Sequence, residues 1–425
     1  MDFAPFYAQN RYNVPPCHPR RKATRELIVL ASCLAGALLY LGLELFRLER
    51  ARRRVGRRIA VSGTRGKSGV TRLIAAGLRA SGARVLAKTT GSKPVLILPD
   101  GSEREIPRPG PASIREQVRL VGLAARLGAD TLVAEMMSIG PECLAAESRL
   151  ILRPGTLVVT NVRLDHLDEM GRTKDAIART MGEAFPRSAA VFLPEEEIRP
   201  AFETAAARTG SRLQPVAPPR GKGEEEEAAA LPAGEFEPNV RLARAVLASL
   251  GVDDAAARRG ISGAPPDFGR LRFWRGRFGD PGRPAVCVSA FAANEPESTA
   301  AVLARVASRL PLKGRPLIGL LCLREDRGSR TLQWVRAAGE GFFRDFAAVI
   351  LAGPTSRAAL RRFRRTGTAS PAFVRFAGPT PEALMERALA VAPGEEPVVI
   401  GLGNIVGWGE RTIRLWTDKG TAYDP

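Results

Sequence analysis

A short glycine-containing loop has the residue types that bind phosphate groups. The loop runs from Ser62 to Ser68 with the sequence S-G-T-R-G-K-S, after the β-branched run 59–61 and before the amphipathic stretch 70–78. Its glycines let backbone N–H groups turn toward an anion, and the N-terminus of the following helix adds partial positive charge. We therefore expect Lys67 to reach the β- and γ-phosphates of a nucleotide and the Ser68 hydroxyl to bind Mg²⁺.

The spacing of this loop is shorter than that of the common phosphate-binding motif. Only Thr64 and Arg65 separate its two glycines, Gly63 and Gly66, whereas the common motif has four residues there. A string as short as G-x-x-G-K-S also occurs by chance, so the flanking strand and helix carry much of the argument. With no nucleotide bound, we expect the end of the Lys67 side chain to be exposed.

Carboxylate, amide and imidazole side chains follow two further apolar runs. Glu135 and Asn161 each come directly after such a run, and the string D-H-L-D begins at Asp165. Ligands of open α/β sheets bind at the carboxyl edge of the strands, which is also where the phosphate-binding loop lies. A carboxylate beside a triphosphate suits Mg²⁺. A lone histidine is more often structural than functional, but the two aspartates around His166 favour a function.

These groups are positioned by an alternation of short apolar runs and amphipathic stretches, which predicts a parallel sheet covered by helices on both faces. The chain of 425 residues is also longer than one hydrophobic core usually holds. We expect an α/β protein with a phosphate-binding central domain and a second, smaller Rossmann-like α/β domain, preceded by an N-terminal transmembrane helix. The strands are expected at 59–61, 85–87, 131–134, 157–160 and 189–193, then at 285–289, 317–321, 348–351 and 398–401.

Composition divides the chain into four parts. We expect an N-terminal tail at 1–26, a transmembrane anchor at 27–46, a nucleotide-binding central domain at 56–262 and a C-terminal domain at 270–418. Within the central domain, residues 209–234 contain several prolines, a Gly-Lys-Gly string and a run of four glutamates. Such a composition buries little apolar surface, so we expect a flexible surface insertion there.

The anchor is predicted from one apolar run. Residues 27–43 carry no charge, and Leu45 and Phe46 extend the run past Glu44, which is long enough to cross a bilayer. A signal peptide is the alternative, but basic residues at 47–58 follow in place of a small-residue cleavage site. A buried helix is the other alternative. Basic residues lie on both sides of the apolar run, so their distribution does not set its orientation. Because ATP is cytosolic, we expect both domains to face the cytoplasm.

The net charge is +20, which attracts nucleic acid, anionic lipid or an acidic small molecule or polymer. Only 6% of the residues are aromatic, which disfavours single-stranded nucleic acid because base stacking needs aromatic side chains.

The five cysteines are widely spaced without a C-x-x-C pair. This pattern indicates a reducing compartment and no structural zinc.

The two motifs together resemble those of the Mur ligases and folylpolyglutamate synthases. G-T-R-G-K-S is similar to their G-T-x-G-K-[ST] loop, and T-N-V-R-L-D-H-L-D is similar to their T-N-x-x-x-D-H-L-D signature. The resemblance implies that Ser68, Glu135 and His166 hold Mg²⁺ and that Lys67, Glu135 and His166 are catalytic. It further implies that ATP is bound by Gly63, Thr64, Arg65, Gly66, Lys67, Ser68, Asn161, Arg270 and Asn294. Many Mur ligases carry a carbamylated lysine about fifteen residues after the D-H pair, whereas residues 178–181 of this chain read A-R-T-M.

Further strings resemble one branch of that family, the poly-γ-glutamate synthases. They are L-A-K-T-T-G-S at 86–92, P-D-G at 99–101, M-G-R-T at 170–173 and A-F-A-A-N-E-P-E-S at 290–298. In this branch ATP converts a glutamate carboxylate to an acyl phosphate, which an amine then attacks. The resemblance implies substrate contacts at Lys88, Thr90 and Ser92, with glutamate and polyglutamate as substrates.

The same resemblance implies a setting for the chain. It implies a single-pass protein of the bacterial inner membrane that works with a small multi-pass membrane subunit and an exporter, as a homo-oligomer and without nucleic acid. Three alternatives stay open: a folylpolyglutamate-type or cell-wall-type ligase for another amino acid, a nucleic-acid-stimulated NTPase, and a non-catalytic nucleotide-binding subunit. Glutamate-dependent ATP hydrolysis separates them. Either D- or L-glutamate fits the sequence.

Overall fold

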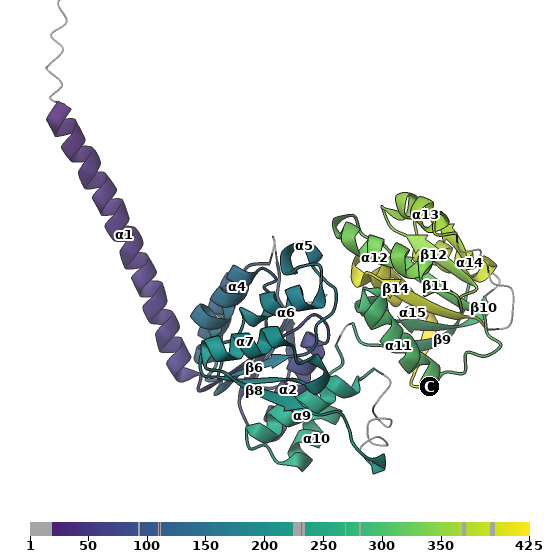
Figure 1. The fold of residues 1–425 in the computed structure, drawn as a ribbon, viewed down its shortest axis with the longest axis horizontal. Coiled ribbons are helices and arrows are strands. Elements are labelled where there is room, and N and C mark those ends of the chain that lie inside the picture. Colours follow the sequence, from purple (N-terminus) through teal and green to yellow (C-terminus); the bar gives the residue numbers. More distant parts are fainter. Residues whose placement is uncertain are drawn as a thin grey trace, which may run out of the picture.

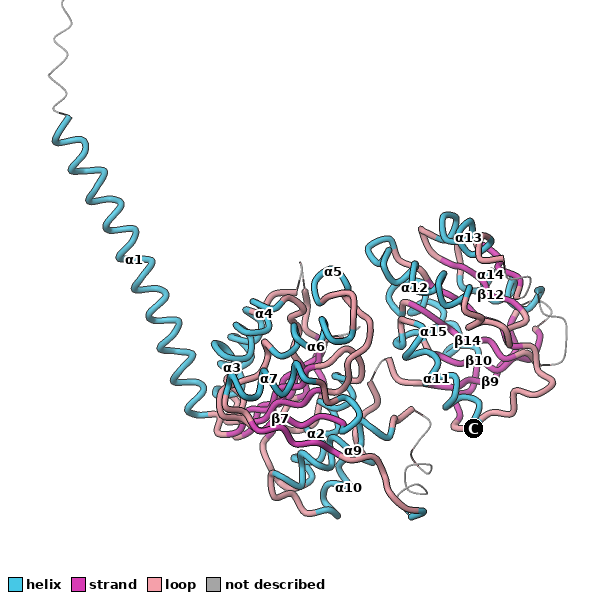
Figure 2. The backbone as a smooth tube through the Cα atoms, viewed as in Figure 1, coloured by secondary structure: helices cyan, strands magenta, loops and turns pink. Residues whose placement is uncertain are grey.

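The protein consists of one long N-terminal helix followed by two α/β domains, as the computed structural model shows (Figures 1 and 2). The structure describes residues 19–425 except 92–93, 109, 111, 224–230, 232–233, 268, 280–281, 368–370 and 392–395. The predicted tail at 1–26 therefore lies mostly outside the described residues.

The N-terminal helix, α1 (Pro19–Arg54), has two parts with different surroundings. Its large apolar side chains from Leu27 to Phe46 are exposed, and the described chain has this one helix long and apolar enough to cross a membrane. Leu48 and Ala51 of the helix, and Val55 directly after it, are instead buried in the core of the central domain. The core of that domain therefore begins inside α1, before the expected boundary at residue 56.

The central domain is built on an eight-stranded sheet in the order β4-β3-β2-β5-β1-β6-β7-β8. Strands β2 and β5 to β8 run parallel to β1, and β3 and β4 form an antiparallel edge. The predicted parallel sheet is confirmed. The strands are β1 (Arg57–Ser62), β2 (Val85–Thr89), β3 (Val95–Ile97), β4 (Glu103–Glu105), β5 (Thr131–Glu135), β6 (Thr156–Val159), β7 (Ala190–Pro194) and β8 (Arg212–Val216).

Helices cover both faces of this sheet, because the buried strands present apolar side chains on both sides. One face packs on the end of α1 and on α3, α6 and α7, and the other on α2, α9 and α10. The helical elements are α2 (Lys67–Ala80), α3 (Arg115–Arg126), α4 (Pro141–Ala145), η1 (Ala146–Leu152), α5 (Leu167–Met170), α6 (Lys174–Gly182), η2 (Glu195–Glu197), α7 (Pro200–Thr209), α9 (Glu237–Ser249) and α10 (Asp254–Ser262).

The prediction of a flexible insertion at 209–234 is wrong for its first part. Residues 212–216 form β8, which pairs with β7 along one side only. Leu213 and Val216 pack against the cores on the two faces of the sheet, and Pro215 is tolerated because β8 is an edge strand. The glutamate run at 224–227 lies outside the described residues.

The C-terminal domain is built on a seven-stranded sheet in the order β13-β12-β11-β14-β10-β9-β15, in which β9 and β15 are antiparallel to their neighbours. Its strands are β9 (Arg272–Phe278), β10 (Arg283–Ser289), β11 (Leu317–Cys322), β12 (Ala348–Ala352), β13 (Ala372–Arg375), β14 (Val398–Gly403) and β15 (Gly420–Tyr423). Its helical elements are η3 (Phe291–Ala293), α11 (Pro296–Arg309), η4 (Glu325–Arg327), α12 (Gly328–Gly339), α13 (Ser356–Arg364), α14 (Pro381–Val391), η5 (Ile405–Gly409) and α15 (Glu410–Lys419). The second α/β domain is thus confirmed.

Candidate active site

Three neighbouring strands bring the sequence motifs to one edge of the central sheet. β1 lies between β5 and β6, with Val61 opposite Glu135 and Ser62 opposite Val159. The phosphate-binding loop leaves β1 at its carboxyl end, Glu135 is the last residue of β5, and Asn161 follows β6. The sequence prediction that these groups meet at one edge is confirmed.

The glycines of the loop are required by its geometry. Gly63 has a φ of 128°, and a Cβ atom there would lie 2.0 Å from the Oγ1 of Thr160. Gly66 has a φ of 79°, and a Cβ atom there would lie 2.6 Å from the Oδ1 of Asn239. Only glycine avoids both the clash and the strain of this backbone.

The Lys67 ammonium group folds back onto the loop. Its Nζ donates to the carbonyl oxygens of Gly63 at 2.8 Å and Thr64 at 3.4 Å, and burial lowers the pKa of Lys67. The expectation of an exposed ammonium group is therefore wrong, because backbone carbonyls bind it. An incoming phosphate would take over these hydrogen bonds.

Asn161 holds the phosphate-binding loop in place. Its Oδ1 accepts hydrogen bonds from the hydroxyl of Thr64 at 2.7 Å and from the backbone N–H of Arg65 at 3.0 Å. Its Nδ2 donates to the carbonyl oxygen of Arg65 at 3.1 Å. These hydrogen bonds show that Asn161 positions the loop. Asn161 also lines an apolar cavity beside the loop.

Ser68 and Glu135 form an oxygen pair that suits a divalent cation. The Ser68 hydroxyl donates to Oε2 of Glu135 at 2.7 Å, and the backbone N–H of Thr90 donates to the same oxygen at 2.7 Å. Mg²⁺ prefers one or two protein oxygens and keeps several waters. The chemistry of this pair fits Mg²⁺, while the described residues contain no group of three His, Cys, Asp or Glu side chains that could hold a metal.

His166 lies between two charged side chains. Its Nδ1 is 3.3 Å from Nη1 of Arg327, and its Nε2 is 3.7 Å from Oδ2 of Asp165. Burial lowers the pKa of His166 to about 4, although the charge of Asp165 opposes that shift. Because arginine can only donate, Nδ1 accepts and the proton lies on Nε2. In this arrangement neither nitrogen offers a free lone pair to a metal.

Asp165 joins the two domains. Its carboxylate accepts hydrogen bonds from Nη2 of Arg330 on α12 at 2.8 and 3.1 Å, and Arg65 of the loop lies 3.2 Å away. Burial alone would raise the pKa of this carboxyl, but the two guanidinium groups hold it well below its usual range. Nη1 of Arg330 also donates to Oδ1 of Asn404, a residue of its own domain, at 3.3 Å.

A cavity of about 460 Å³ lies between the phosphate-binding loop and the C-terminal domain. The central domain contributes Lys67, Ser68, Glu135 and His166 to its lining, and the C-terminal domain contributes Arg324, Arg327 and Arg330. These three arginines were not predicted as site residues. The string R-E-D-R-G-S-R directly after an apolar run could have indicated them, by the same strand-end argument that located Glu135.

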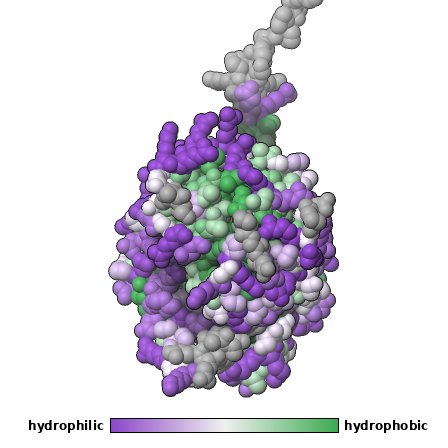
Figure 3. All heavy atoms as spheres, turned by 90° about the vertical axis from the view of Figure 1, so that its right-hand side faces the viewer, coloured by the Kyte–Doolittle hydropathy of each residue, from purple (hydrophilic) through white to green (hydrophobic). Residues whose placement is uncertain are grey.

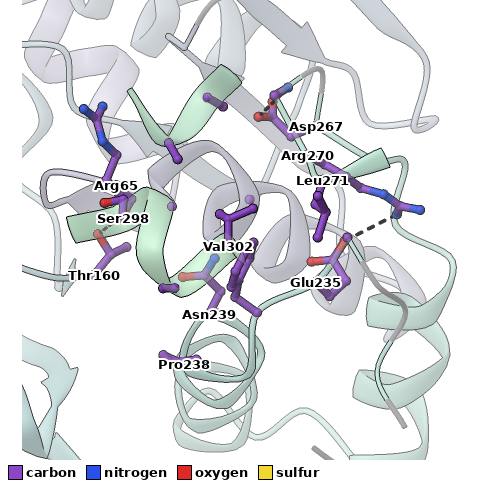
Figure 4. Close-up of a pocket in the computed structure, with 18 of the residues that line it drawn as sticks. Arg65, Thr160, Glu235, Pro238, Asn239, Asp267, Arg270, Leu271, Ser298 and Val302 are labelled. Atoms are coloured by element: carbon purple, nitrogen blue, oxygen red, sulfur yellow. Dashed lines mark hydrogen bonds and ion pairs between the residues drawn. The ribbon is translucent and has the colours of Figure 1, made fainter. Parts of the chain in front are cut away.

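A second, more apolar cavity of about 270 Å³ lies beside the loop and shares Arg65 and Gly66 with the first (Figure 4). Phe236 and Asn239 from the start of α9 and Ala292 from η3 also line it. The Ser289 hydroxyl in its wall is buried and has no hydrogen-bond partner among the described residues. A flat base with polar edges fits such a cavity. Asn239 was not predicted, although an asparagine at a helix start is a recognisable polar group.

The remaining predicted residues have different positions. Arg270 lines the apolar cavity and pairs with Glu235 at 3.5 Å, and burial raises the pKa of Glu235. Thr90 and Asn294 line the first cavity. Lys88 is buried 3.1 Å from Glu116 and lines neither cavity, so its position does not support a substrate contact. Ser92 lies outside the described residues.

Comparisons with known proteins agree with this architecture. Residues 61–213 match the Mur ligase middle domain and residues 276–419 match the poly-gamma-glutamate synthase CapB C-terminal domain. The capsule biosynthesis protein CapB of Bacillus anthracis is 30% identical over 84% of this chain and 76% of its own. The PGA synthase CapB of Bacillus subtilis (strain 168) is 28% identical over 84% and 89%.

A solved structure shows the same fold. The bifunctional folylpolyglutamate synthase/dihydrofolate synthase of Yersinia pestis, complexed with AMPPNP and a Mn ion, superimposes with a TM-score of 0.59 at 18% identity, over 87% of this chain and 93% of its own. The order of motifs, the two-domain fold and the relatives agree, and the chain belongs to the CapB family of Mur ligases.

Proposed function

We propose that this protein is an ATP-dependent amide ligase that adds glutamate to a growing poly-γ-glutamate chain. One observation carries the proposal: a phosphate-binding lysine, an oxygen pair for a cation and three arginines line a single cavity between the domains. The CapB relatives, one of them named a PGA synthase, support the choice of glutamate.

The two adjoining cavities accommodate the two ends of ATP. The apolar cavity would receive the adenine, with Asn239 and the unpaired Ser289 hydroxyl available to its polar edges. The triphosphate would then extend along the loop that both cavities share. The Lys67 ammonium group, now bonded to two loop carbonyls, would turn to the β- and γ-phosphates. The Yersinia pestis structure with AMPPNP supports this use of the fold.

Ser68 and Glu135 would hold Mg²⁺, which when bound neutralises phosphate charge and orients the γ-phosphate. Glu135 is already fixed for this purpose by the backbone N–H of Thr90. A Cβ atom on Gly91 would lie 2.8 Å from the Ser68 hydroxyl, so glycine keeps the space beside that hydroxyl open. The Mn ion in the Yersinia pestis structure supports a divalent cation.

The reaction needs two displacements in the same cavity. A glutamate carboxylate oxygen attacks the γ-phosphorus and ADP leaves, which gives an acyl phosphate. The amine of the second substrate then attacks the acyl carbon, phosphate leaves with the C–O bond electrons, and the amine loses a proton to solvent or phosphate. Arg324 and Arg327 face this space and would bind the carboxylates and the developing phosphate charge.

The N-terminal helix supports a membrane location. Its exposed apolar part would span the bacterial inner membrane once, and both α/β domains would lie in the cytoplasm, where ATP is available. The basic residues after the anchor would face anionic headgroups. We further propose that the chain works as a homo-oligomer with a small multi-pass subunit and an exporter, and that nucleic acid is not a ligand.

Purified full-length protein incubated with ATP, Mg²⁺ and single amino acids tests the function. ADP release should depend on D- or L-glutamate, with and without a polyglutamate primer, and should be lost by more than a hundredfold in Lys67→Ala. Lys313→Ala on the other domain is the control. Stimulation by folate, alanine or a cell-wall precursor without stimulation by glutamate would contradict the proposed substrate. Binding of ATP without any turnover would indicate a non-catalytic subunit.

A further inference from the structure

Helix α13 carries positive charge for which the described residues provide no counter-charge. The exposed guanidinium groups belong to Arg357, Arg361, Arg362 and Arg364 of the helix and to Arg365 directly after it. None of the five has an ion pair or a side-chain hydrogen bond within the described chain. The sequence has no acidic residue between Asp345 and Glu382.

This cluster differs from other arginines on the surface of the same domain. Arg336 on α12 pairs with Glu340 at 2.9 Å, and Arg275 on β9 pairs with Glu396 at 2.6 Å. Five unpaired like charges within nine residues repel one another. An anionic partner would relieve that repulsion, so the cluster points to a polyanionic surface.

The C-terminal end of α1 packs into the central domain. Leu48 and Ala51 of the helix are buried in the core. Glu49 pairs with Arg52 at 3.3 Å and with Arg153, which follows η1, at 3.3 Å. Arg58 donates to the carbonyl oxygen of Val55 at 2.6 Å, which satisfies the end of the helix. The direction of α1 therefore fixes the orientation of the central domain.

Contacts of helix α12 with the central domain fix the orientation of the C-terminal domain relative to it. Its Arg330 binds Asp165, and its Gln333 donates to the carbonyl oxygen of Leu164 at 3.2 Å. Helix α13 packs beside α12. Figure 1 shows α13 at the top of the C-terminal domain, and α1 rises from the central domain toward the top of the picture while leaning away from the C-terminal domain. We call this upper end of the molecule the anchor side. Figure 3 shows hydrophilic residues along the same side, where α1 rises behind the domain.

We propose that α13 binds the anionic phospholipid headgroups of the bilayer that α1 spans. The protein then contacts the membrane at two points, through the anchor of the central domain and through the arginines of the C-terminal domain. This proposal rests on the proposed anchor. An acidic polymer would also match the charge, but the position of α13 on the anchor side favours lipid.

The two contacts have a consequence for the active site. The cavity lies between the domains, so a bilayer that holds α1 and α13 together holds the cavity closed around its substrates. Arginine suits this role because its guanidinium group donates several hydrogen bonds to a phosphate at once. Anionic lipid should therefore favour the closed arrangement that Asp165 and Arg330 form.

Photocrosslinking of the full-length protein in nanodiscs tests the contact. Benzoylphenylalanine replaces Ala358, which is exposed on α13, or Ala422, which is exposed on β15 near the chain end as the matched control. The discs contain phosphatidylcholine alone or with phosphatidylglycerol. Retention of the chain in discs checks the anchor, and ADP release checks the proposed ligase separately.

We expect phospholipid adducts at position 358 in discs with phosphatidylglycerol and few at position 422. Combined R361Q, R362Q and R365Q should reduce the adducts about tenfold or more, as should omission of the anionic lipid. Equal adducts at both positions, or none at position 358, would overturn the proposal. Added polyglutamate that replaces lipid in the adducts would overturn it in favour of a polymer-binding surface.

Discussion

Asp165 of the central domain and Arg330 of the C-terminal domain form a buried ion pair, with Nη2 of Arg330 2.8 Å from Oδ1 of Asp165. Arg65 of the phosphate-binding loop approaches the same carboxylate. The nucleotide loop and the second domain thus meet at one carboxylate of the D-H string, beside the contact between His166 and Arg327. Closure of the domains and order in the loop should therefore change together.

Replacing Arg330 with alanine should open the interface and reduce kcat. Removal of one partner from a buried charge pair costs about 3–5 kcal/mol, although Arg65 still neutralises part of the Asp165 charge. We expect a larger radius of gyration by small-angle scattering and a loss of ADP release. Arg336→Ala, on the solvent side of the same helix, is the control. An unchanged radius with full activity would show that the pair does not hold the domains together.

His166 should stay neutral down to acidic pH. Burial lowers its pKa from the ordinary 6.5 to about 4, so between these values the unfolded chain binds a proton that the folded chain does not. Stability therefore falls as pH decreases from 6.5 to 4, by about 3 kcal/mol in total. The His166→Gln variant should not show this decrease in stability between pH 6.5 and 4. The chain has two histidines, so ring-labelled nuclear magnetic resonance gives two signals, and a His166 midpoint near 6.5 would contradict the geometry.

The sequence predicted those parts of the site in which reactive residue types lie at the ends of apolar runs. The loop around Lys67, the carboxylate of Glu135 and the D-H string were located because strand ends and residue types coincide there. Long-range partners were not predictable in this way. That Arg327 lies 161 residues from His166 in sequence and 3.3 Å away in space depends on how the two domains pack, which no local pattern encodes.

Two boundaries show where composition misleads. The segment 209–234 has a polar, proline-containing composition, yet Arg212–Val216 pairs with β7 because a single exposed edge tolerates proline. The apolar run of α1 suggested an anchor ending at Phe46, yet Leu48 begins the domain core. The switch from exposed to core-facing side chains leaves no break in a continuous helix.

Glu135→Ala should weaken metal binding more than any other single change in the site. The variant removes the carboxylate of the oxygen pair with Ser68, and we expect the Mn²⁺ affinity in the presence of AMPPNP to fall at least tenfold. Electron paramagnetic resonance counts the bound ion directly. Glu142→Ala, exposed on α4, should have no effect.

His166→Ala in the same assay shows whether His166 stays bonded to Arg327 or becomes a metal ligand. Because its Nδ1 accepts from Arg327, we expect a smaller loss of Mn²⁺ affinity than in Glu135→Ala. A loss equal to that of Glu135→Ala would show that Arg327 leaves the imidazole and that His166 becomes a ligand, as the resemblance to the Mur ligases implies.

The end of α1 should contribute to the stability of the central domain. Leu48 is 7% exposed and Leu45 is 62% exposed, although both lie on the same helix. Leu48→Ala leaves a cavity in the core and should cost about 2–4 kcal/mol, whereas Leu45→Ala should leave the domain unchanged. Thermal unfolding of the two variants in the same detergent measures the difference. Equal melting temperatures would place the domain boundary after α1.

Arg324 should bind a carboxylate of the substrate, and this prediction separates substrate binding from nucleotide binding. Its guanidinium group lines the cavity but pairs with Asp326 through two bonds of 2.8 and 2.7 Å. A substrate carboxylate must compete with Asp326, so the two residues should have opposite effects. We expect Arg324→Ala to raise the KM for a polyglutamate acceptor about tenfold and Asp326→Ala to lower it, with the KM for ATP unchanged in both. Arg344→Ala, exposed in the same domain, is the control.

Salt should weaken acceptor binding in the wild type more than in Arg324→Ala, because the variant has lost one charge contact. If both variants raise the KM for ATP instead, this guanidinium group serves the nucleotide, and the acceptor binds elsewhere in the cavity.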